Sequence, residues 1–363
     1  MGPSTETSSG AAAGAGSPAE VAVRPALPED ASAVDAFVLS SEAGTFFHLT
    51  GWTRAVVEEF GHRDRSLVAE RGDEIVGVLP LTECAGLLGG RALISNAYAV
   101  YGGPAAVDRE AELALVRAAE ELAVVERVGR LELRCQRDLD VGFERLDLHA
   151  TFIRELPGSA EEVLKCMPKK SRADARKARQ QHGLTLREGR WYVGDLARLF
   201  HQNKQALGSP ALPATFFARL LAIFPERATI HLTKQGEEPV MAVMSFLFRD
   251  QVLAYYSGTA ANADRRCKAS AFTYMALQEW SIDAGYRVFD FGRSRKGSGA
   301  FAFKARQGFE PAELYYQIRR VRDQALPSLN PSNPKTLILQ RTWRSLPAGL
   351  ATRLSARASR YLP

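Results

Sequence analysis

Apolar positions along the chain follow the two spacings that mark secondary structure, the alternation of half-buried strands and the three-to-four-residue repeat of amphipathic helices. In the first half, strands are expected over residues 21–24, 66–70, 75–81, 91–96 and 130–134. Helices are expected from Pro28 onward, over residues 52–60 and over residues 110–128. Residues 71–74, with Gly72 among them, join the second and third strands and predict a hairpin.

The second half repeats this order of elements. Strands are expected over residues 228–233, 240–249, 251–257, 288–291 and 313–319, and a helix over residues 270–284. Gly236 corresponds to Gly72 in the hairpins and Gly285 to Gly129 after the helices, so the copies lie about 160 residues apart. The pattern predicts a duplicated α/β (α+β) domain with mixed sheets flanked by helices.

The duplication suggests a division of the chain. We expect a first domain over residues 21–150 and a second over residues 151–334, which carries the active site. Residues 1–20 are rich in alanine, glycine, serine and threonine and are expected to be a disordered tail. Residues 335–363 form a separate basic amphipathic segment.

The composition, 46% hydrophobic and 24% charged, is that of an ordinary soluble protein. No apolar run approaches the roughly 18 residues of a membrane-spanning helix, and residues 1–20 lack the pattern of a signal peptide. The four cysteines are scattered without metal-ligand spacing. We therefore expect a cytoplasmic protein with no metal and no bound cofactor.

Residues 335–363 contain six cations and no acid, which accounts for the whole net charge of +6. Their apolar side chains fall near one helical face: Trp343, Leu346, Leu350 and Leu354. Pro347 interrupts the helix. Such a segment fits peripheral contact with the anionic inner face of a membrane. The alternative is a helix packed on the body of the protein.

Residues 288–309 hold the most informative stretch, a buried strand followed by a basic glycine-rich loop and a short helix. Ser298 is expected to cap this helix, and Lys304 lies on it close to Phe301 and Phe303. A cation among aromatic rings at a strand end is suited to stabilising developing negative charge. A plain turn is the alternative. The kinase and P-loop interpretations fail, because their companion motifs are missing.

Residues 165–179 contain seven cations and one acid. Arg172, Arg176 and Arg179 have the i, i+4, i+7 spacing of one helical face. Guanidinium groups arranged in this way bind phosphates, so a diphosphate ligand or an RNA backbone is indicated. A solvated cationic face is the alternative, and nothing indicates DNA as a partner.

These motifs resemble a known family. The run Pro168-Lys-Lys-Ser-Arg172, followed by Arg176, and the pair Phe303-Lys304 resemble the FemAB family, in which two GNAT (acyl-CoA N-acyltransferase-like) domains stand in tandem. Segments 100–104, 290–294, 304–311 and 329–335 are similar to FemAB-related proteins that accompany exosortase (PEP-CTERM) and exopolysaccharide systems. The resemblance implies an enzyme that attaches amino acids from aminoacyl-tRNA to peptidoglycan precursors.

The resemblance also implies roles for single residues. Lys304 matches the lysine that stabilises the oxyanion, and Phe303 matches the aromatic residue beside it. Arg172 and Arg176 match the region that binds the diphosphate of the acceptor. Two neighbouring cations are included in this substrate-binding set: Lys169 and Lys170.

The donor is expected to be either aminoacyl-tRNA or acyl-CoA. Simple acetyltransferases bind the pyrophosphate of coenzyme A with an Arg/Gln-x-x-Gly-x-Gly/Ala loop. Here Arg266, Ala269 and Ala271 occupy the corresponding positions. Methyl groups at both small positions obstruct close backbone approach and disfavour coenzyme A without excluding it.

The expected reaction is the attack of an acceptor amine on an activated carbonyl. Lys304 and the N–H groups of residues 297–299 stabilise the oxyanion, and Asp290 or water takes the proton. A structural carboxylate is the alternative for Asp290. Four further residues are expected to bind substrate: Arg293, Arg295, Tyr255 and Tyr256. Core packing is the alternative for the two tyrosines.

Three functions remain open at this point. The first is an acyl or aminoacyl transferase that acts on a phosphate-bearing cell-envelope precursor, with charged tRNA as a partner. The second is a coenzyme-A-dependent N-acyltransferase that modifies a sugar or lipid-linked saccharide. The third is a non-catalytic module that binds a glycan carrier.

Overall fold

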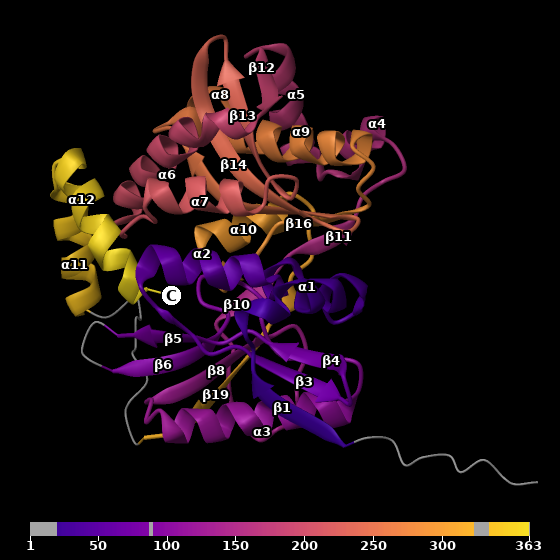
Figure 1. Ribbon diagram of the computed structural model, residues 1–363. Helices are drawn as coiled ribbons and strands as arrows, with labels where there is room; N and C mark the ends of the chain where they lie inside the picture. The colour runs from indigo at the N-terminus through magenta and orange to yellow at the C-terminus, as the bar shows by residue number, and fades with distance from the viewer. Residues whose placement is uncertain (1–19, 87–89, 323–333, 363) are drawn as a thin grey trace, which may run out of the picture.

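The computed structural model describes residues 20–86, 90–322 and 334–362. Its mixed α/β fold consists of two halves stacked against each other, drawn in indigo to purple and in magenta to orange in Figure 1. Residues 1–19 of the expected tail and most of the 329–335 motif lie outside the described residues. No helix in the described ranges is both long and apolar enough to cross a bilayer.

The first half contains two sheets and three α-helices among the described residues. One sheet has the order β1 (Val21–Pro25), β3 (Leu67–Arg71), β4 (Glu74–Leu79), β7 (Ala105–Ala106). The other has the order β2 (Arg63–Asp64), β5 (Thr82–Ala85), β6 (Arg91–Ser95), β8 (Arg130–Cys135), β19 (Tyr315–Arg320), β9 (Glu144–Leu146). The helices are η1 (Pro28–Asp30), α1 (Ala31–Ser40), η2 (Phe46–His48), α2 (Thr50–Phe60) and α3 (Arg109–Val125).

The second half is built on a single larger sheet. Its order is β11 (Ile153–Glu155), β16 (Val288–Asp290), β15 (Gln251–Thr259), β14 (Glu238–Phe248), β13 (Ala228–Gln235), β12 (Leu184–Glu188). Its helices are α4 (Ala160–Cys166), α5 (Lys169–Gln180), η3 (Arg190–Tyr192), α6 (Val193–Leu207), α7 (Ala214–Ile223), α8 (Ala263–Cys267), α9 (Ala269–Asp283) and α10 (Gly299–Arg306). A small separate sheet has the order β17 (Ser294–Arg295), β10 (His149–Thr151), β18 (Ala312–Glu313).

The predicted duplication is confirmed in its central unit. In the first half β6 and β8 run parallel and are connected through α3. In the second half β15 and β16 run parallel and are connected through α9. The preceding hairpins turn at Gly72 and Gly236, both with positive φ, where glycine avoids the steric cost of a side chain.

The two halves are joined by strands as well as by side-chain packing. Strand β19 follows the second half in sequence but pairs antiparallel with β8 of the first, with Tyr316 opposite Arg134. The largest core cluster also draws residues from both halves. Within it the ring of Phe46 stacks on that of Phe246, with centroids 4.4 Å apart. The expected division into domains stays a prediction, and β19 is a strand of the second half in sequence that belongs to a sheet of the first.

The segment between β12 and β13 folds into α6 and α7, which the sequence analysis did not predict. Its signal was the i, i+3, i+4 spacing of Leu196, Leu199 and Phe200, all of them buried. Helix α6 packs on β15 and β14. It thereby forms one wall of the second half.

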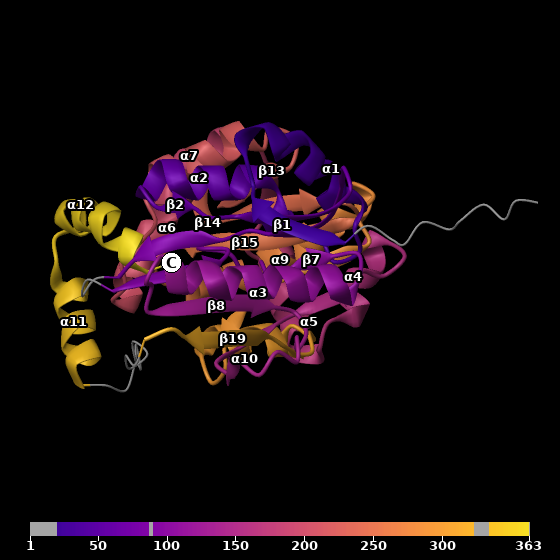
Figure 2. The same ribbon diagram turned by 60° about the horizontal axis from the view of Figure 1, so that its bottom comes forward.

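The basic segment after residue 334 forms α11 (Pro334–Ser345), α12 (Ala348–Ala358) and the short η4 (Ser359–Tyr361). The predicted break at Pro347 is confirmed. Both helices pack against α6, and Figures 1 and 2 show them in yellow at one side of the molecule.

The close approach of α6 to β15 yields a prediction about stability. A Cβ atom at Gly258 would lie 2.3 Å from the backbone nitrogen of Phe200, so Gly258→Ala must push the helix away from the sheet. We expect the free energy of unfolding to fall by about 1–3 kcal/mol, measured by urea denaturation. The control Gly194→Ala adds a methyl group to α6 where nothing lies within 4 Å. An equal loss in both variants would contradict this explanation.

Candidate functional site

Lys304 lies on α10, a helix whose start is determined by the sequence. Ser298 is the N-cap, and its Oγ accepts a hydrogen bond from the backbone N–H of Phe301 at 3.2 Å, as predicted. From α10 the ammonium group of Lys304 donates to the backbone oxygens of Gly292 (2.8 Å) and Arg293 (3.0 Å). These two carbonyls follow strand β16, so the lysine is held at the strand end.

The surroundings of Lys304 change its acidity. Burial lowers its pKa to about 8, the nearby carboxylate of Asp290 opposes this shift, and the charge of Arg293 adds to it. The Nζ atom lies 5.3 Å from the ring centroid of Phe291 and 5.6 Å from that of Phe152. An ammonium group in this position is partly desolvated and loses its proton at a lower pH than an exposed lysine does.

The aromatic neighbours of Lys304 differ from those expected from the sequence. Phe301 packs on the ring of Phe152, and Phe303 lies 5.9 Å from the ring of Tyr274. The rings over which the Lys304 ammonium lies are those of Phe291 and Phe152, and not those of Phe301 and Phe303. Phe303 therefore supports the helix from the side.

Asp290 ends β16 and is 1% exposed. Its carboxylate accepts hydrogen bonds from the Gly292 N–H (2.7 Å), the Tyr101 hydroxyl (3.0 Å) and the Gln251 amide (3.5 Å). Burial raises its pKa to about 6, and the hydrogen bonds from Gly292 and Tyr101 together with the charge of Lys304 limit the shift. The bond to Gly292 also orients the carbonyl that holds Lys304.

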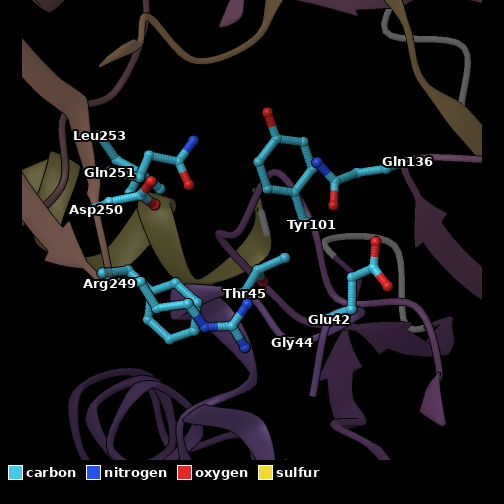
Figure 3. A pocket seen from close by; sticks show the side chains of 10 residues that line it. Glu42, Gly44, Thr45, Tyr101, Gln136, Arg249, Asp250, Gln251 and Leu253 are labelled. Carbon is cyan, nitrogen blue, oxygen red and sulfur yellow. The ribbon is translucent and has the colours of Figure 1, made fainter. Parts of the chain in front are cut away.

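A pocket of about 210 Å³ lies at the junction of the two halves. Figure 3 shows Gln251 and Leu253 on one wall, with Tyr101 and Gln136 on the opposite wall. Because Tyr101 and Gln251 also bond to Asp290, the pocket is separated from that carboxylate by a single layer of side chains. The lining is polar: Glu42, Thr45, Gln136, Asp250 and Gln251.

The predicted substrate-binding arginines of the loop have different environments. Arg293 donates to the Tyr316 hydroxyl at 2.7 Å, and that hydroxyl donates to the Val100 carbonyl at 2.8 Å. This chain ties the loop to β19 and to the first half. Arg295 belongs to β17, where its backbone pairs opposite His149.

A further cation, Lys204 on α6, faces the same region. Burial and the charge of Arg293 lower its pKa, and its ammonium lies 5.3 Å from the ring centroid of Phe200. The site thus gathers cations from α6, α10 and the loop between β16 and β17. Such a gathering favours an anionic substrate group.

The two tyrosines on β15 are separated by the structure. The hydroxyl of Tyr255 donates to the Tyr98 carbonyl at 2.8 Å, so this side chain joins the two halves. Tyr256 is 8% exposed and belongs to the core cluster. Its hydroxyl has no hydrogen-bond partner among the described residues.

The basic helix α5 presents an exposed cationic face: Lys169, Lys170, Arg176 and Lys177. Arg172 instead turns back and donates to the carbonyls of Met167 (2.9 Å) and Lys165 (3.1 Å). Among the described residues, neither Arg172 nor Arg176 forms a hydrogen bond with Lys304 or with the residues around it. Binding of one ligand by Lys304, Arg172 and Arg176 together therefore stays a prediction. Helices α5 and α10 do meet, because the Ser171 hydroxyl donates to the carbonyl of Arg306 at 2.6 Å.

The residues expected at a pyrophosphate loop precede and begin α9. Arg266 is paired with both carboxylate oxygens of Glu238, at 2.8 and 2.9 Å, while Ala269 and Ala271 are buried. The carboxylate of Asp264 accepts hydrogen bonds from the Ser270 N–H (2.7 Å) and hydroxyl (3.0 Å). A negative charge therefore already occupies the start of this helix.

Sequence reasoning missed Tyr101, Gln251 and Lys204 as site residues. Tyr101 had a signal, since it stands in segment 100–104, one of the segments that carry the family resemblance. Gln251 and Lys204 had none, because their position depends on packing between distant segments. Among the described residues no group of histidine, cysteine and acidic side chains is arranged to hold a metal ion.

Comparisons with known proteins bear on the fold. Residues 167–305 match the family model described as acetyltransferase (GNAT) domain, and no curated protein sequence matches the chain. The solved structure of FemX superposes with a TM-score of 0.62 at 16% identity, covering 82% of this chain and 97% of that one.

Two further structures have the same fold. L-PGS from Bacillus licheniformis superposes with a TM-score of 0.54 at 14% identity, covering 89% of this chain and 98% of that one. A tandem GNAT protein from the clavulanic acid biosynthesis pathway superposes with a TM-score of 0.53 at 15% identity, covering 84% and 100%. The fold is therefore that of tandem GNAT proteins, as predicted, and an acyltransferase is supported. The link to exosortase systems stays a prediction.

The raised pKa of Asp290 predicts a pH-dependent contribution to stability. The folded state binds this proton more tightly than the unfolded state, so the stabilisation is full below about pH 4 and is lost as the pH rises to about 6. Asp290→Asn carries no charge to desolvate. We expect its free energy of unfolding, relative to wild type, to rise across this range by at most about 3 kcal/mol.

Urea denaturation at closely spaced pH values measures the difference. The control Asp283→Asn removes a carboxylate that is exposed at the end of α9. An equal rise in the free energy of unfolding of the control variant would show that the pH dependence does not come from Asp290.

Proposed function

We propose that this protein transfers an acyl or aminoacyl group to an amine of a cell-envelope precursor and forms an amide. One observation carries the proposal: the ammonium of Lys304 is held by the carbonyls of Gly292 and Arg293. An ammonium group has three N–H donors. Two are used in these bonds, and the third is available for a substrate oxygen.

The mechanism follows from this free donor. The acceptor amine attacks the carbonyl carbon of the donor ester or thioester, and the carbonyl oxygen becomes negative. Lys304 donates its third N–H to that oxygen, in a half-buried site where the interaction is stronger than in water. The tetrahedral intermediate then expels the donor's alcohol or thiol, and the amine loses its proton.

Asp290 is proposed as a positioning residue. Its carboxylate is enclosed by the Gly292 N–H, Tyr101 and Gln251, and it orients the loop that holds Lys304. With a pKa of about 6, it is ionised at neutral pH and keeps the lysine protonated. Water in the adjacent pocket is the proposed acceptor of the amine proton.

Aminoacyl-tRNA is the favoured donor. A diphosphate at the start of α9 would meet the carboxylate of Asp264, and Arg266 would have to leave Glu238 to compensate. The repulsion between the diphosphate and the Asp264 carboxylate disfavours coenzyme A as the donor. The exposed cations of α5 lie next to the end of α10 and suit an RNA backbone or a phosphate-bearing precursor.

The likeness to FemX and to L-PGS supports this choice at the level of fold. The match to the acetyltransferase (GNAT) domain model keeps a coenzyme-A-dependent N-acyltransferase as the second candidate. The proposed phosphate-binding role of Arg172 requires that it release two carbonyl oxygens, whereas Arg176 is exposed and free to bind.

Replacing the catalytic ammonium tests the mechanism. Lys304→Met keeps the length of the side chain and removes the donor, so we expect the transfer rate to fall about 10²–10³-fold. In wild type the rate should also decline as the pH rises through about 8, where Lys304 loses its proton. The control Lys296→Met removes a cation of the same loop that pairs with Asp147 instead. Wild-type rates in Lys304→Met would remove this residue from the mechanism.

Supplying labelled donors tests the choice between candidates. Labelled aminoacyl-tRNA and labelled acetyl-CoA are each offered with a nucleotide-linked peptidoglycan precursor. We expect label on the precursor from aminoacyl-tRNA and no measurable heat of acetyl-CoA binding in calorimetry, because Asp264 repels the diphosphate. Transfer from acetyl-CoA alone would establish the second candidate instead.

A further inference from the structure

Helices α11 and α12 are anchored to the body through a small, polar inner face. The Ser355 hydroxyl accepts a hydrogen bond from the Ala211 N–H at 3.1 Å, and the Gln205 amide donates to the Leu346 carbonyl at 2.6 Å. The Tyr98 hydroxyl donates to the Ser359 carbonyl at 3.1 Å. These contacts orient α12 with one face inward and leave the rest of its surface outward.

The outward surface of α12 combines leucines with arginines. Leu350 is 45% exposed and Leu354 is 37% exposed, although large apolar side chains are normally covered. Positions 350, 354 and 357 have the i, i+4, i+7 spacing of one helical face. Arg353 and Arg357 are exposed beside these leucines. We call these four residues the α12 flank.

The charge of this segment is one-sided. The sequence from Lys335 to Pro363 has six cations and no acid, whereas the remainder of the chain is formally neutral. Arg353 and Arg357 form no hydrogen bond or ion pair with any residue in the described ranges. Other exposed arginines do pair with acids, as Arg179 does with Glu279. The cations of the α12 flank are therefore available to an external anionic surface.

We propose that the α12 flank docks this protein on an anionic lipid bilayer. Arginines at a membrane surface meet lipid phosphates, while exposed leucines on the same side enter the boundary between headgroups and acyl chains. A nucleic acid would use the arginines but would leave the leucines uncovered. The cationic face of α5 differs in this respect, because its exposed positions are Lys169, Lys170, Arg176 and Lys177 without an exposed large apolar neighbour.

Docking through the α12 flank would bring the bilayer close to the candidate site. Helix α6 packs against α11 and α12 on one side and against β15 on the other. The same helix contributes Lys204, whose pKa is lowered by burial and by the charge of Arg293. A bilayer bound to the flank would lie one helical layer away from the candidate site. In both Figure 1 and Figure 2, α11 and α12 lie together at one edge of the molecule.

Vesicle co-sedimentation of the full chain tests the proposal. Wild type is expected to bind phosphatidylcholine vesicles that contain phosphatidylglycerol, to bind pure phosphatidylcholine vesicles much more weakly, and to be released by high salt. Each arginine near an anionic surface is worth about a fivefold change in binding. The double variant Arg353→Glu/Arg357→Glu should therefore bind about 25-fold more weakly or worse.

A second variant separates lipid from other anionic partners. Leu350→Ser/Leu354→Ser keeps every charge and should still lower vesicle binding about tenfold, since less apolar surface enters the bilayer. The control Arg117→Glu/Arg127→Glu changes the net charge equally at exposed positions on and just after α3, and should bind like wild type. Thermal denaturation checks that each variant is folded.

Three results would overturn the proposal. Equal sedimentation of the wild type with anionic and neutral vesicles, or no sedimentation with either, would exclude an anionic bilayer as the partner. An equal loss of binding in the control variant and the arginine variant would reduce the effect to net charge. Wild-type vesicle binding by the serine variant, together with a loss of binding to a labelled RNA oligonucleotide by the arginine variant, would identify a nucleic-acid surface. Donor-transfer activity is not part of this readout, so the outcome is independent of the proposed reaction.

Discussion

The structure depends on one buried carboxylate, that of Asp290, at the point where the two halves meet. Its partners come from the first half, through the Tyr101 hydroxyl, and from its own loop, through the Gly292 N–H. A buried charge of this kind persists only when it is hydrogen-bonded. The same bonds that satisfy it also orient the carbonyls that hold Lys304. Assembly of the two halves and organisation of the site are thus one event.

The cations of the protein fall into three sets with different surroundings. Lys304, Arg293 and Lys204 are half-buried, and burial lowers the pKa of the two lysines. The cations of α5 are exposed next to the end of the Lys304 helix. The α12 flank carries arginines beside exposed leucines. Burial suits the first set to chemistry on a substrate oxygen, and exposure suits the other two to binding large anionic surfaces.

Much of the fold was predictable because it depends on local patterns. Hairpins at Gly72 and Gly236, the cap at Ser298 and the break at Pro347 all follow from backbone preferences of single residues. The pairing of β19 with β8 was not predictable in this way. Strand partners far apart in sequence are selected by packing of whole sheets, and no local spacing encodes that choice.

The sequence by itself determined a duplicated unit with a lysine on a capped helix after a buried strand, because capping and strand periodicity act over a few residues. Only the tertiary structure decided what that lysine touches. It directed Lys304 to two backbone carbonyls, turned Arg172 back onto its own helix start, and brought Tyr101 and Gln251 to Asp290. The physical reason is that burial and hydrogen-bond partners are properties of the packed molecule, and they determine which ionisable groups share a site.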